Sequence, residues 1–179
     1  MSICVVEIGP MNQEVAGSWS SSVNIRILVA DDSAPWRRFV SSLILPERPE
    51  WHIVCEVSDG LEAVKKAEEL RPDLILMDIG LPKLSGIDAA RRISKIVSNL
   101  KILFLSAFDS LEIVQEALNT GASGYVVKLE AASELIGAVE AVFQGKRFIS
   151  SGLSRACLTD GRSAEKELRK QRPTGRRLS

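Results

Sequence analysis

The sequence predicts an α/β fold, a three-layer sandwich in which helices cover both faces of a parallel sheet. Five short apolar runs alternate with segments whose apolar residues recur at helical spacing. The third run, Asp73–Asp78, is the most continuously apolar, as expected for a central strand that is covered on both faces. Regular alternation of this kind indicates a sheet built from strand–helix units. In chain order the strands are expected at Ile25–Ala30, His52–Val57, Asp73–Asp78, Lys101–Leu105 and Gly124–Val127.

Each helix is expected after one of these strands, where apolar side chains three or four positions apart form one face. These side chains are Trp36, Phe39, Val40 and Leu43; Ala63, Ala67 and Leu70; Ala90, Ile93 and Val97; Leu111, Val114 and Leu118; and Leu135, Val139 and Val142. Ser33 is a suitable N-cap for the first helix, which Pro46 and Pro49 should end. Pro72 should stop the second helix and Gly121 the fourth.

Composition divides the chain into three parts. Residues 1–23 have no sustained period and include a serine-rich stretch, so we expect a flexible N-terminal extension, in which Met11 is an alternative start. Residues 24–147 hold the five strand–helix units and should form one domain. Residues 148–179 are expected to be a linker and a basic, disordered tail, because residues 155–179 contain eight Lys/Arg and three acidic residues.

The overall composition is that of a cytoplasmic globular protein. Hydrophobic residues make up 45% and charged residues 26% of the 179 residues, and the formal net charge is zero. The three cysteines lie far apart and form no CxxC pair, which argues against a disulfide framework or a zinc site. No apolar run is long enough to cross a bilayer, and the N-terminal residues lack the features of a secretory signal. We therefore expect a cytoplasmic location and no membrane contact.

Polar side chains follow four of the five expected strands. Asp31 and Asp32 come directly after the first strand, Asp78 closes the third, Ser106 follows the fourth and Lys128 follows the fifth. The carboxyl ends of parallel strands share one edge of the sheet, which is where such proteins bind their ligands. We therefore expect these five side chains to form one site.

The residue types at this edge suit phosphoryl transfer. Crowded carboxylates repel one another unless a cation neutralises them, and an oxygen-only ligand set suits Mg²⁺. With Mg²⁺ and Lys128 screening an incoming phosphoryl group, Asp78 is able to attack it and form an aspartyl phosphate. The Ser106 hydroxyl is able to donate a hydrogen bond to a phosphoryl oxygen.

Four motifs in this order resemble the receiver domain of bacterial two-component response regulators over about residues 24–147. They are Val-Ala-Asp31-Asp32, Leu-Met-Asp78-Ile-Gly-Leu-Pro-Lys-Leu-Ser-Gly86, Leu-Ser106-Ala and Gly-Ala-Ser-Gly-Tyr125-Val-Val-Lys128. The resemblance implies a flavodoxin-like (βα)5 fold with strand order 2-1-3-4-5. It also implies that Asp78 is the phosphoacceptor, with Mg²⁺ as the cofactor.

The resemblance assigns further roles around Asp78. It implies that Asp32, Asp78 and the backbone carbonyl of Gly80 are direct Mg²⁺ ligands and that Asp31 acts largely through water. Ser106 and Lys128 then correspond to the switch hydroxyl and the phosphate-pairing lysine, and Tyr125 to the aromatic rotamer switch of the family.

Two departures from the family pattern affect these expectations. Leu129 stands where many receivers have a proline, although receivers of this kind often lack it. The Gly-Ala-Ser-Gly-Tyr motif and the later Phe-Gln-Gly-Lys-Arg-Phe-Ile-Ser are most similar to receivers that precede a LuxR-type helix-turn-helix. Such a module needs on the order of 60 residues with its own core, whereas 29 residues follow Ser150.

We therefore expect a stand-alone receiver that a histidine kinase phosphorylates. Its output would be protein contacts made by the face of the fourth helix, fifth strand and fifth helix, including a possible homodimer, with an unknown downstream partner. The alternative is a transcription regulator that binds DNA through its basic tail or through a lost helix-turn-helix output domain. DNA binding by the tail is disfavoured because no aromatic residue follows Phe148 to stack on a base.

Two other classes of protein fit less well. A phosphatase of the haloacid dehalogenase type needs Asp-x-Asp at the nucleophile, but Gly80 stands two residues after Asp78. A flavin-binding flavodoxin is disfavoured because Asp31 and Asp32 would repel the flavin phosphate. We therefore expect a phosphoacceptor that takes part in its own phosphorylation and dephosphorylation, and not an enzyme acting on a separate substrate.

Overall fold

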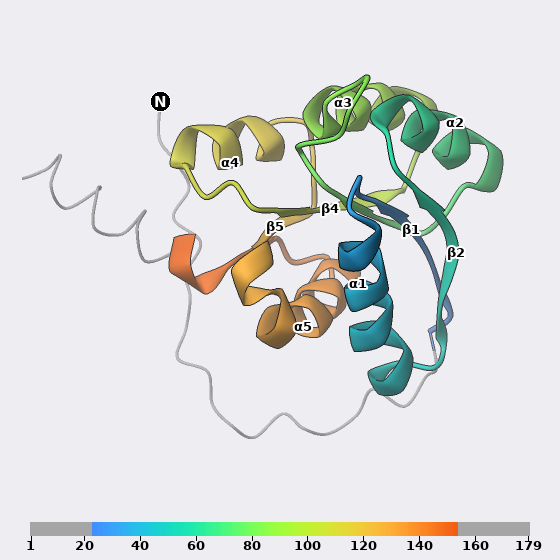
Figure 1. The fold of residues 1–179 in the computed structure, drawn as a ribbon, viewed down its shortest axis with the longest axis vertical. Coiled ribbons are helices and arrows are strands. Elements are labelled where there is room, and N and C mark those ends of the chain that lie inside the picture. Colours follow the sequence, from blue (N-terminus) through green and yellow to red (C-terminus); the bar gives the residue numbers. More distant parts are fainter. Residues whose placement is uncertain (1–22, 154–179) are drawn as a thin grey trace, which may run out of the picture.

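The computed structural model describes residues 23–153. The expected N-terminal extension, apart from its last residue, and most of the expected basic tail lie outside the described residues, as do Cys4 and Cys157. Within the described range, no helix is both long and apolar enough to cross a membrane. The elements in chain order are β1 Ile25–Ala30, α1 Ala34–Glu47, β2 Trp51–Val57, α2 Gly60–Leu70, β3 Leu74–Met77, α3 Gly86–Ile96, β4 Lys101–Ser106, α4 Leu111–Leu118, β5 Gly124–Val127, the 3-10 turn η1 Lys128–Glu130, α5 Ala131–Phe143 and β6 Phe148–Ile149 (Figure 1).

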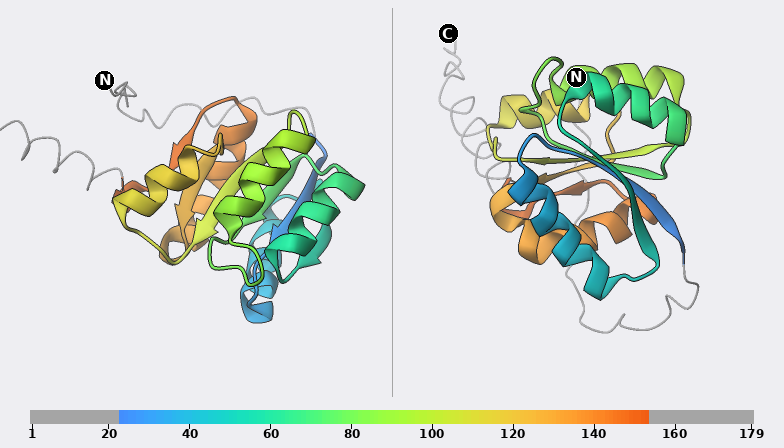
Figure 2. Two further views of the ribbon diagram at one scale, coloured as in Figure 1. Left: turned by 90° about the horizontal axis from the view of Figure 1, so that it is seen from above. Right: turned by 45° about the vertical axis from the view of Figure 1, so that its right-hand side comes forward.

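The strands form one parallel sheet in the order β2-β1-β3-β4-β5-β6. Helices α1 and α5 cover one face of the sheet, and α2, α3 and α4 cover the other (Figures 1 and 2). This arrangement confirms the predicted three-layer sandwich and the predicted order of the first five strands. Helix α1 ends at Glu47, between the two prolines that were expected to end it.

Two buried apolar layers hold the helices to the sheet. Successive side chains of a strand point to opposite faces, so Ile27 and Val29 join the layer under α1 and α5, whereas Leu28 and Ala30 join the layer under α2, α3 and α4. Strand β3 is buried along its whole length, as expected for a strand with helices on both sides. This double burial keeps the carboxyl ends of the central strands at fixed relative positions.

A sixth strand, β6, extends the sheet beyond the five that the sequence predicts. Its two residues pair with Gly124 and Tyr125 of β5. A Cβ built on Gly124 would lie 2.6 Å from the carbonyl oxygen of Phe148, so the absence of a side chain at Gly124 allows β6 to approach. The described fold therefore continues past residue 147, where the sequence suggested that the domain ends.

The residues after β6 are held against β5 and α5. The fully buried Ser150 accepts a hydrogen bond from the backbone N–H of Val127 at 2.9 Å and donates one to Glu134 at 2.7 Å. The next two backbone N–H groups donate to the carboxylates of Glu134 and Glu130. Hydrogen bonds from this segment outweigh the effect of burial on Glu134 and lower the pKa of its carboxyl. The chain that leaves the domain is thus fixed beside the strand that precedes Lys128.

Candidate functional site

The carboxyl ends of β1, β3, β4 and β5 bring together the five side chains that the sequence analysis placed at this edge. In-register pairing sets Ala30 of β1 beside Met77 of β3, and the backbone N–H of Asp78 donates to the carbonyl of Ala30 at 2.8 Å. The residue after β1, Asp31, therefore lies beside the residue after β3, Asp78. The sheet itself sets this spacing.

Three aspartates form an acidic cluster at this edge. Each of Asp31, Asp32 and Asp78 offers one carboxylate oxygen, and these three oxygens lie within 4.8 Å of one another. Asp31 and Asp78 are buried, whereas Asp32 is exposed. Three carboxylate oxygens at one edge of the sheet match the hard oxygen ligands that Mg²⁺ prefers. The residues that are present therefore fit the metal expected from the sequence.

Lys128 bridges the two buried aspartates. Its Nζ lies 2.7 Å from Oδ2 of Asp31 and 2.8 Å from Oδ2 of Asp78. Burial by itself lowers the pKa of this ammonium, but the hydrogen bonds to the two carboxylates outweigh burial, so the pKa of Lys128 is raised. The lysine is therefore a positive charge at neutral pH, paired with two of the three aspartates of the acidic cluster.

The second carboxylate oxygen of Asp78 accepts hydrogen bonds from uncharged donors. The Ser106 hydroxyl donates to Oδ1 of Asp78 at 2.9 Å, and the backbone N–H of Gly80 approaches the same oxygen at 3.4 Å. Ser106 is fully buried at the end of β4. The two carboxylate oxygens of Asp78 thus have different partners, Lys128 on one side and Ser106 with Gly80 on the other.

Asp31 also orders the start of α1. Its Oδ1 accepts a hydrogen bond from the backbone N–H of Ser33 at 2.8 Å, and the Ser33 side chain caps the helix by accepting from the N–H of Trp36. Burial raises the pKa of the Asp31 carboxyl, against the lowering effect of the hydrogen bonds from Lys128 and Ser33. One aspartate therefore links the acidic cluster to the position of a helix.

Close backbone packing fixes the loop that follows Asp78. A Cβ built on Gly86 would lie 1.9 Å from the carbonyl oxygen of Asp78, so only glycine fits where α3 begins. Within the same loop, Lys83 takes a positive φ of 63° and pairs with Asp59 at 2.6 Å. The contact at Gly86 holds the Asp78 backbone against the start of α3, whereas the Lys83–Asp59 pair joins the loop to the start of α2.

Tyr125 lies inside the protein, behind the acidic cluster. Its hydroxyl donates to the backbone carbonyl of Phe108 at 2.7 Å, and the side chain is fully buried. Burial raises the pKa of this phenol to about 12. The residue is thus anchored to the loop that follows Ser106 and leads from β4 to α4. Its role as a switch stays a prediction.

Two contacts at the site were not predicted from the sequence. The sequence placed Trp36 only on the apolar face of the first helix, yet Nζ of Lys128 lies 5.2 Å from the centre of its ring. Phe108, which accepts the Tyr125 hydrogen bond, is itself 45% exposed. Helical spacing identifies Trp36 as a residue of the inner face, and a pattern along one helix gives no signal for a contact with Lys128, a residue distant in sequence.

Leu129, which replaces the proline of many receivers, is 94% exposed and follows a trans peptide bond.

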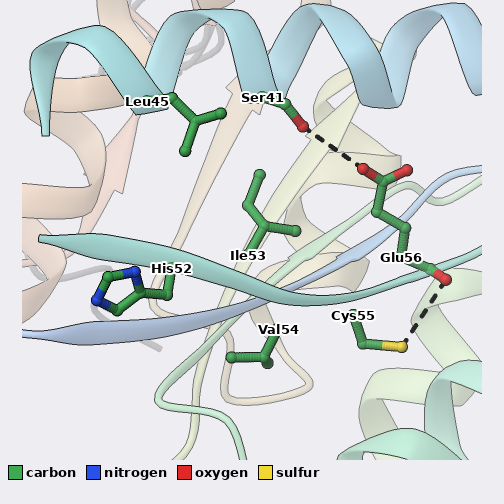
Figure 3. A pocket seen from close by; sticks show the side chains of 7 residues that line it. All are labelled: Ser41, Leu45, His52, Ile53, Val54, Cys55 and Glu56. Carbon is green, nitrogen blue, oxygen red and sulfur yellow. Dashed lines mark hydrogen bonds between the residues drawn. The ribbon is translucent and has the colours of Figure 1, made fainter. Parts of the chain in front are cut away.

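A separate hollow lies between α1 and the edge strand β2, and its lining includes no residue of the acidic cluster (Figure 3). Its lining residues are Ser41, Leu45, His52, Ile53, Val54, Cys55 and Glu56. Ser41 donates to the Glu56 carboxylate at 3.5 Å, and the Cys55 thiol donates to the Glu56 backbone carbonyl at 3.8 Å. Burial raises the pKa of the Cys55 thiol, so this side chain is not an activated nucleophile.

Comparisons with known proteins show the family to which the chain is similar. The family model of the response regulator receiver domain matches residues 27–140. The transcriptional regulatory protein DegU of Brevibacillus brevis is 38% identical over 139 residues, which are 78% of this chain and 56% of DegU. The chemotaxis protein CheY of Thermotoga maritima is 37% identical over 117 residues, which are 65% of this chain and 96% of CheY.

The fold is also shared with solved structures. A LuxR-family two-component response regulator from Aurantimonas sp. SI85-9A1 superimposes with a TM-score of 0.70 and 33% sequence identity, over 74% of this chain and 94% of that chain. The chain thus spans little more than half of the length of DegU but nearly all of CheY. From the family match over residues 27–140, the 37% identity to CheY and the shared fold, we conclude that this chain belongs to the response regulator receiver domain family.

Proposed function

We propose that this protein is a phosphorylation-dependent switch of a two-component system and that Asp78 is the residue that accepts the phosphoryl group. The observation that carries the proposal is the different environment of the two Asp78 oxygens, one paired with Lys128 and the other with Ser106. A carboxylate held between a cation and a hydroxyl is in a suitable position to attack a phosphorus atom while both partners stabilise the charge that develops.

The reaction is a phosphoryl transfer from a donor phosphohistidine of a histidine kinase. An oxygen of Asp78 forms a bond to phosphorus as the bond between phosphorus and the donor nitrogen breaks, and the donor ring, which carries a proton from solvent on its other nitrogen, leaves as neutral imidazole. Asp31, Asp32, Asp78 and the Gly80 carbonyl are the groups that would hold Mg²⁺, which neutralises phosphoryl charge when it is bound.

The neighbouring side chains then hold the product. Lys128 is able to follow the phosphoryl oxygens because the same ammonium already reaches Asp78 at 2.8 Å. Ser106 is able to turn its hydroxyl toward a phosphoryl oxygen, and this movement would draw in the loop to which Tyr125 is anchored. The signal would thus leave the site through α4, β5 and α5.

We propose that the output is made by protein contacts of this α4–β5–α5 face, with a downstream partner or a second copy of the chain. The match covers 96% of the length of CheY. This supports the proposal that a receiver domain by itself is enough to signal. The protein would act in the cytoplasm, where a kinase and Mg²⁺ are available. It would catalyse no reaction on a separate substrate, since the receiver family is a phosphoacceptor module.

The experiment that tests this function is incubation with a small-molecule phosphodonor and Mg²⁺, followed by intact-protein mass spectrometry. The wild type should gain the mass of one phosphoryl group, and Asp78→Ala should gain none. An unmodified wild type, or an equal gain in Asp78→Ala, would contradict the proposal. Omission of Mg²⁺ should remove most of the gain, because the acidic cluster then repels the donor.

A second candidate function is regulation of transcription, which the similarity to the transcriptional regulatory protein DegU favours. In this case the basic residues 155–179, which lie outside the described residues, would contact DNA phosphates. Salt-dependent DNA binding that is lost when residues 155–179 are deleted would support this function. Absence of binding at low salt would exclude DNA contact by this segment.

A further inference from the structure

Trp36 occupies a position between α1 and the lysine of the acidic cluster. It is the third residue of α1, where the Ser33 cap orders the backbone, and Ser33 is in turn bonded to Asp31. The ammonium of Lys128 lies over the Trp36 ring, with Nζ 5.2 Å from the ring centroid. This distance and geometry are those of a cation–π contact.

The indole orientation does not depend on its own hydrogen bond. Within residues 23–153, the buried Nε1 of Trp36 has no hydrogen-bond partner, whereas a buried indole N–H usually finds an acceptor. The ring instead packs against Phe39, with the two centroids 4.8 Å apart and an angle of 41° between the planes. Its contacts are thus an aromatic neighbour on the same helix, the buried apolar layer under α1 and α5, and the cation of Lys128.

Lys128 needs a contact of this kind because its other two partners have competing ligands. The lysine is a long, flexible side chain held at its end by Asp31 and Asp78. Both carboxylates are also groups that would bind Mg²⁺. In addition, phosphorylation bonds one oxygen of Asp78 to phosphorus, so Asp78 is no longer a free carboxylate anion. The Trp36 ring binds no metal and accepts no phosphoryl group, so its attraction for the ammonium continues through the reaction.

We infer that Trp36 is a positioning residue for the phosphorylation reaction and that it acts by holding the Lys128 ammonium over the Asp78 carboxylate. The inference rests on the proposed function of Lys128. Trp36 is not a catalytic residue, since it acts only through the lysine. The rate of phosphorylation should therefore depend on an aromatic ring at position 36 more than on the volume of the apolar side chain there.

The test is a double-mutant cycle measured on the rate of phosphorylation by a small-molecule donor with Mg²⁺. Trp36→Leu should slow the reaction about fivefold, and Trp36→Phe should restore most of the rate, because phenylalanine keeps a weaker cation–π contact. In a Lys128→Met background, Trp36→Leu should have no further effect. Trp51→Phe is the matched control, because the Trp51 ring lies over the Arg48 guanidinium at 5.7 Å, away from the acidic cluster.

A second readout does not depend on phosphorylation. Protons that lie over an indole face are shielded, so the ε-methylene protons of Lys128 should resonate upfield in the metal-free wild type. They should return toward ordinary lysine positions in Trp36→Leu and remain partly shifted in Trp36→Phe. The NMR spectrum of each variant also shows whether it is folded. If Trp36→Leu is unfolded, Trp36→Phe is compared with the wild type instead. It should show a smaller upfield shift of the Lys128 protons and a slightly slower phosphorylation than the wild type.

The outcomes separate this inference from the proposed function. A wild type that gains no phosphoryl group would contradict the proposed function itself. A wild type that is phosphorylated, with Trp36→Leu as fast as the wild type or equally slowed in the Lys128→Met background, would overturn the inference. Unshifted Lys128 protons in the wild type would overturn it as well.

Discussion

The Lys128 ammonium lies 2.8 Å from Oδ2 of Asp78, a residue 50 positions earlier in the chain. The two residues follow β5 and β3, and β4 lies between these strands in the sheet. The same nitrogen reaches Asp31 at 2.7 Å, so one cation neutralises two carboxylates that are themselves close together. Lys128 and a bound metal would therefore share Asp31 and Asp78 as partners.

Removal of the lysine should destabilise the protein only when no metal is present. Lys128→Met leaves Asp31 and Asp78 without their cation, and we expect the free energy of unfolding to fall by about 1–2 kcal/mol in EDTA. Added Mg²⁺ should close most of this gap, because it binds the folded variant without displacing a lysine. Urea unfolding with EDTA and with Mg²⁺ measures both effects.

The control for this substitution is Lys83→Met. Lys83 pairs with Asp59 outside the acidic cluster and is itself largely exposed, so its loss should change the free energy of unfolding by less than about 0.5 kcal/mol. The result should not depend on Mg²⁺. An equal loss of stability for Lys128→Met with and without Mg²⁺ would contradict the sharing of Asp31 and Asp78 by lysine and metal.

The Ser106 hydroxyl should affect the rate of phosphorylation through its hydrogen bond to Asp78. Ser106→Ala removes the donor to Oδ1, and we expect a decrease of about tenfold in the rate with a small-molecule donor. Ser106→Thr keeps the hydroxyl and should retain most of the rate. Ser110→Ala is a suitable control, since the Ser110 side chain makes no capping hydrogen bond at the start of α4. Equal rates for Ser106→Ala and Ser110→Ala would show that the hydroxyl has no role.

Gly86 should tolerate no side chain, in contrast to Gly137. Gly86→Ala would place a Cβ 1.9 Å from the Asp78 carbonyl oxygen, so the free energy of unfolding should fall by about 2–4 kcal/mol. Gly137 lies within α5, where a Cβ would meet no atom within 4 Å, and Gly137→Ala should raise stability by about 0.5–1 kcal/mol. Chemical denaturation of both variants tests the difference. Similar stability of the two alanine variants would contradict the close packing of α3 on Asp78.

Tyr125 should titrate well above an ordinary tyrosine. Burial raises its pKa from 10.0 to about 12, and because it is the chain's one tyrosine, ultraviolet absorbance follows it directly. The unfolded chain releases this proton first, so the contribution of Tyr125 to stability is complete below pH 10 and is lost as the pH rises toward 12. Circular dichroism at each pH value distinguishes titration of the folded protein from unfolding. A midpoint near 10 in the folded protein would contradict the buried position.

The sequence predicted the parts of this structure that depend on local patterns. Burial on both faces gives the central strands continuous apolar runs, so the strands and the edge at which Asp31, Asp78 and Ser106 meet were predictable. Strand β6 was not, because two residues are too few to form a pattern. The contacts of Ser150 and Trp36 depend on residues brought close only by the complete fold, and no spacing along the chain indicates them.

The most direct test of the central claim is the position of the phosphoryl group. After phosphorylation with Mg²⁺ present, reduction by borohydride converts an aspartyl phosphate to homoserine, and tandem mass spectrometry of the peptides locates the modified residue. The structure predicts homoserine at residue 78 alone, because only Asp78 lies between Lys128 and Ser106 in the part of the chain that the structure describes. Homoserine at position 31 or 32, or at no position, would contradict the account.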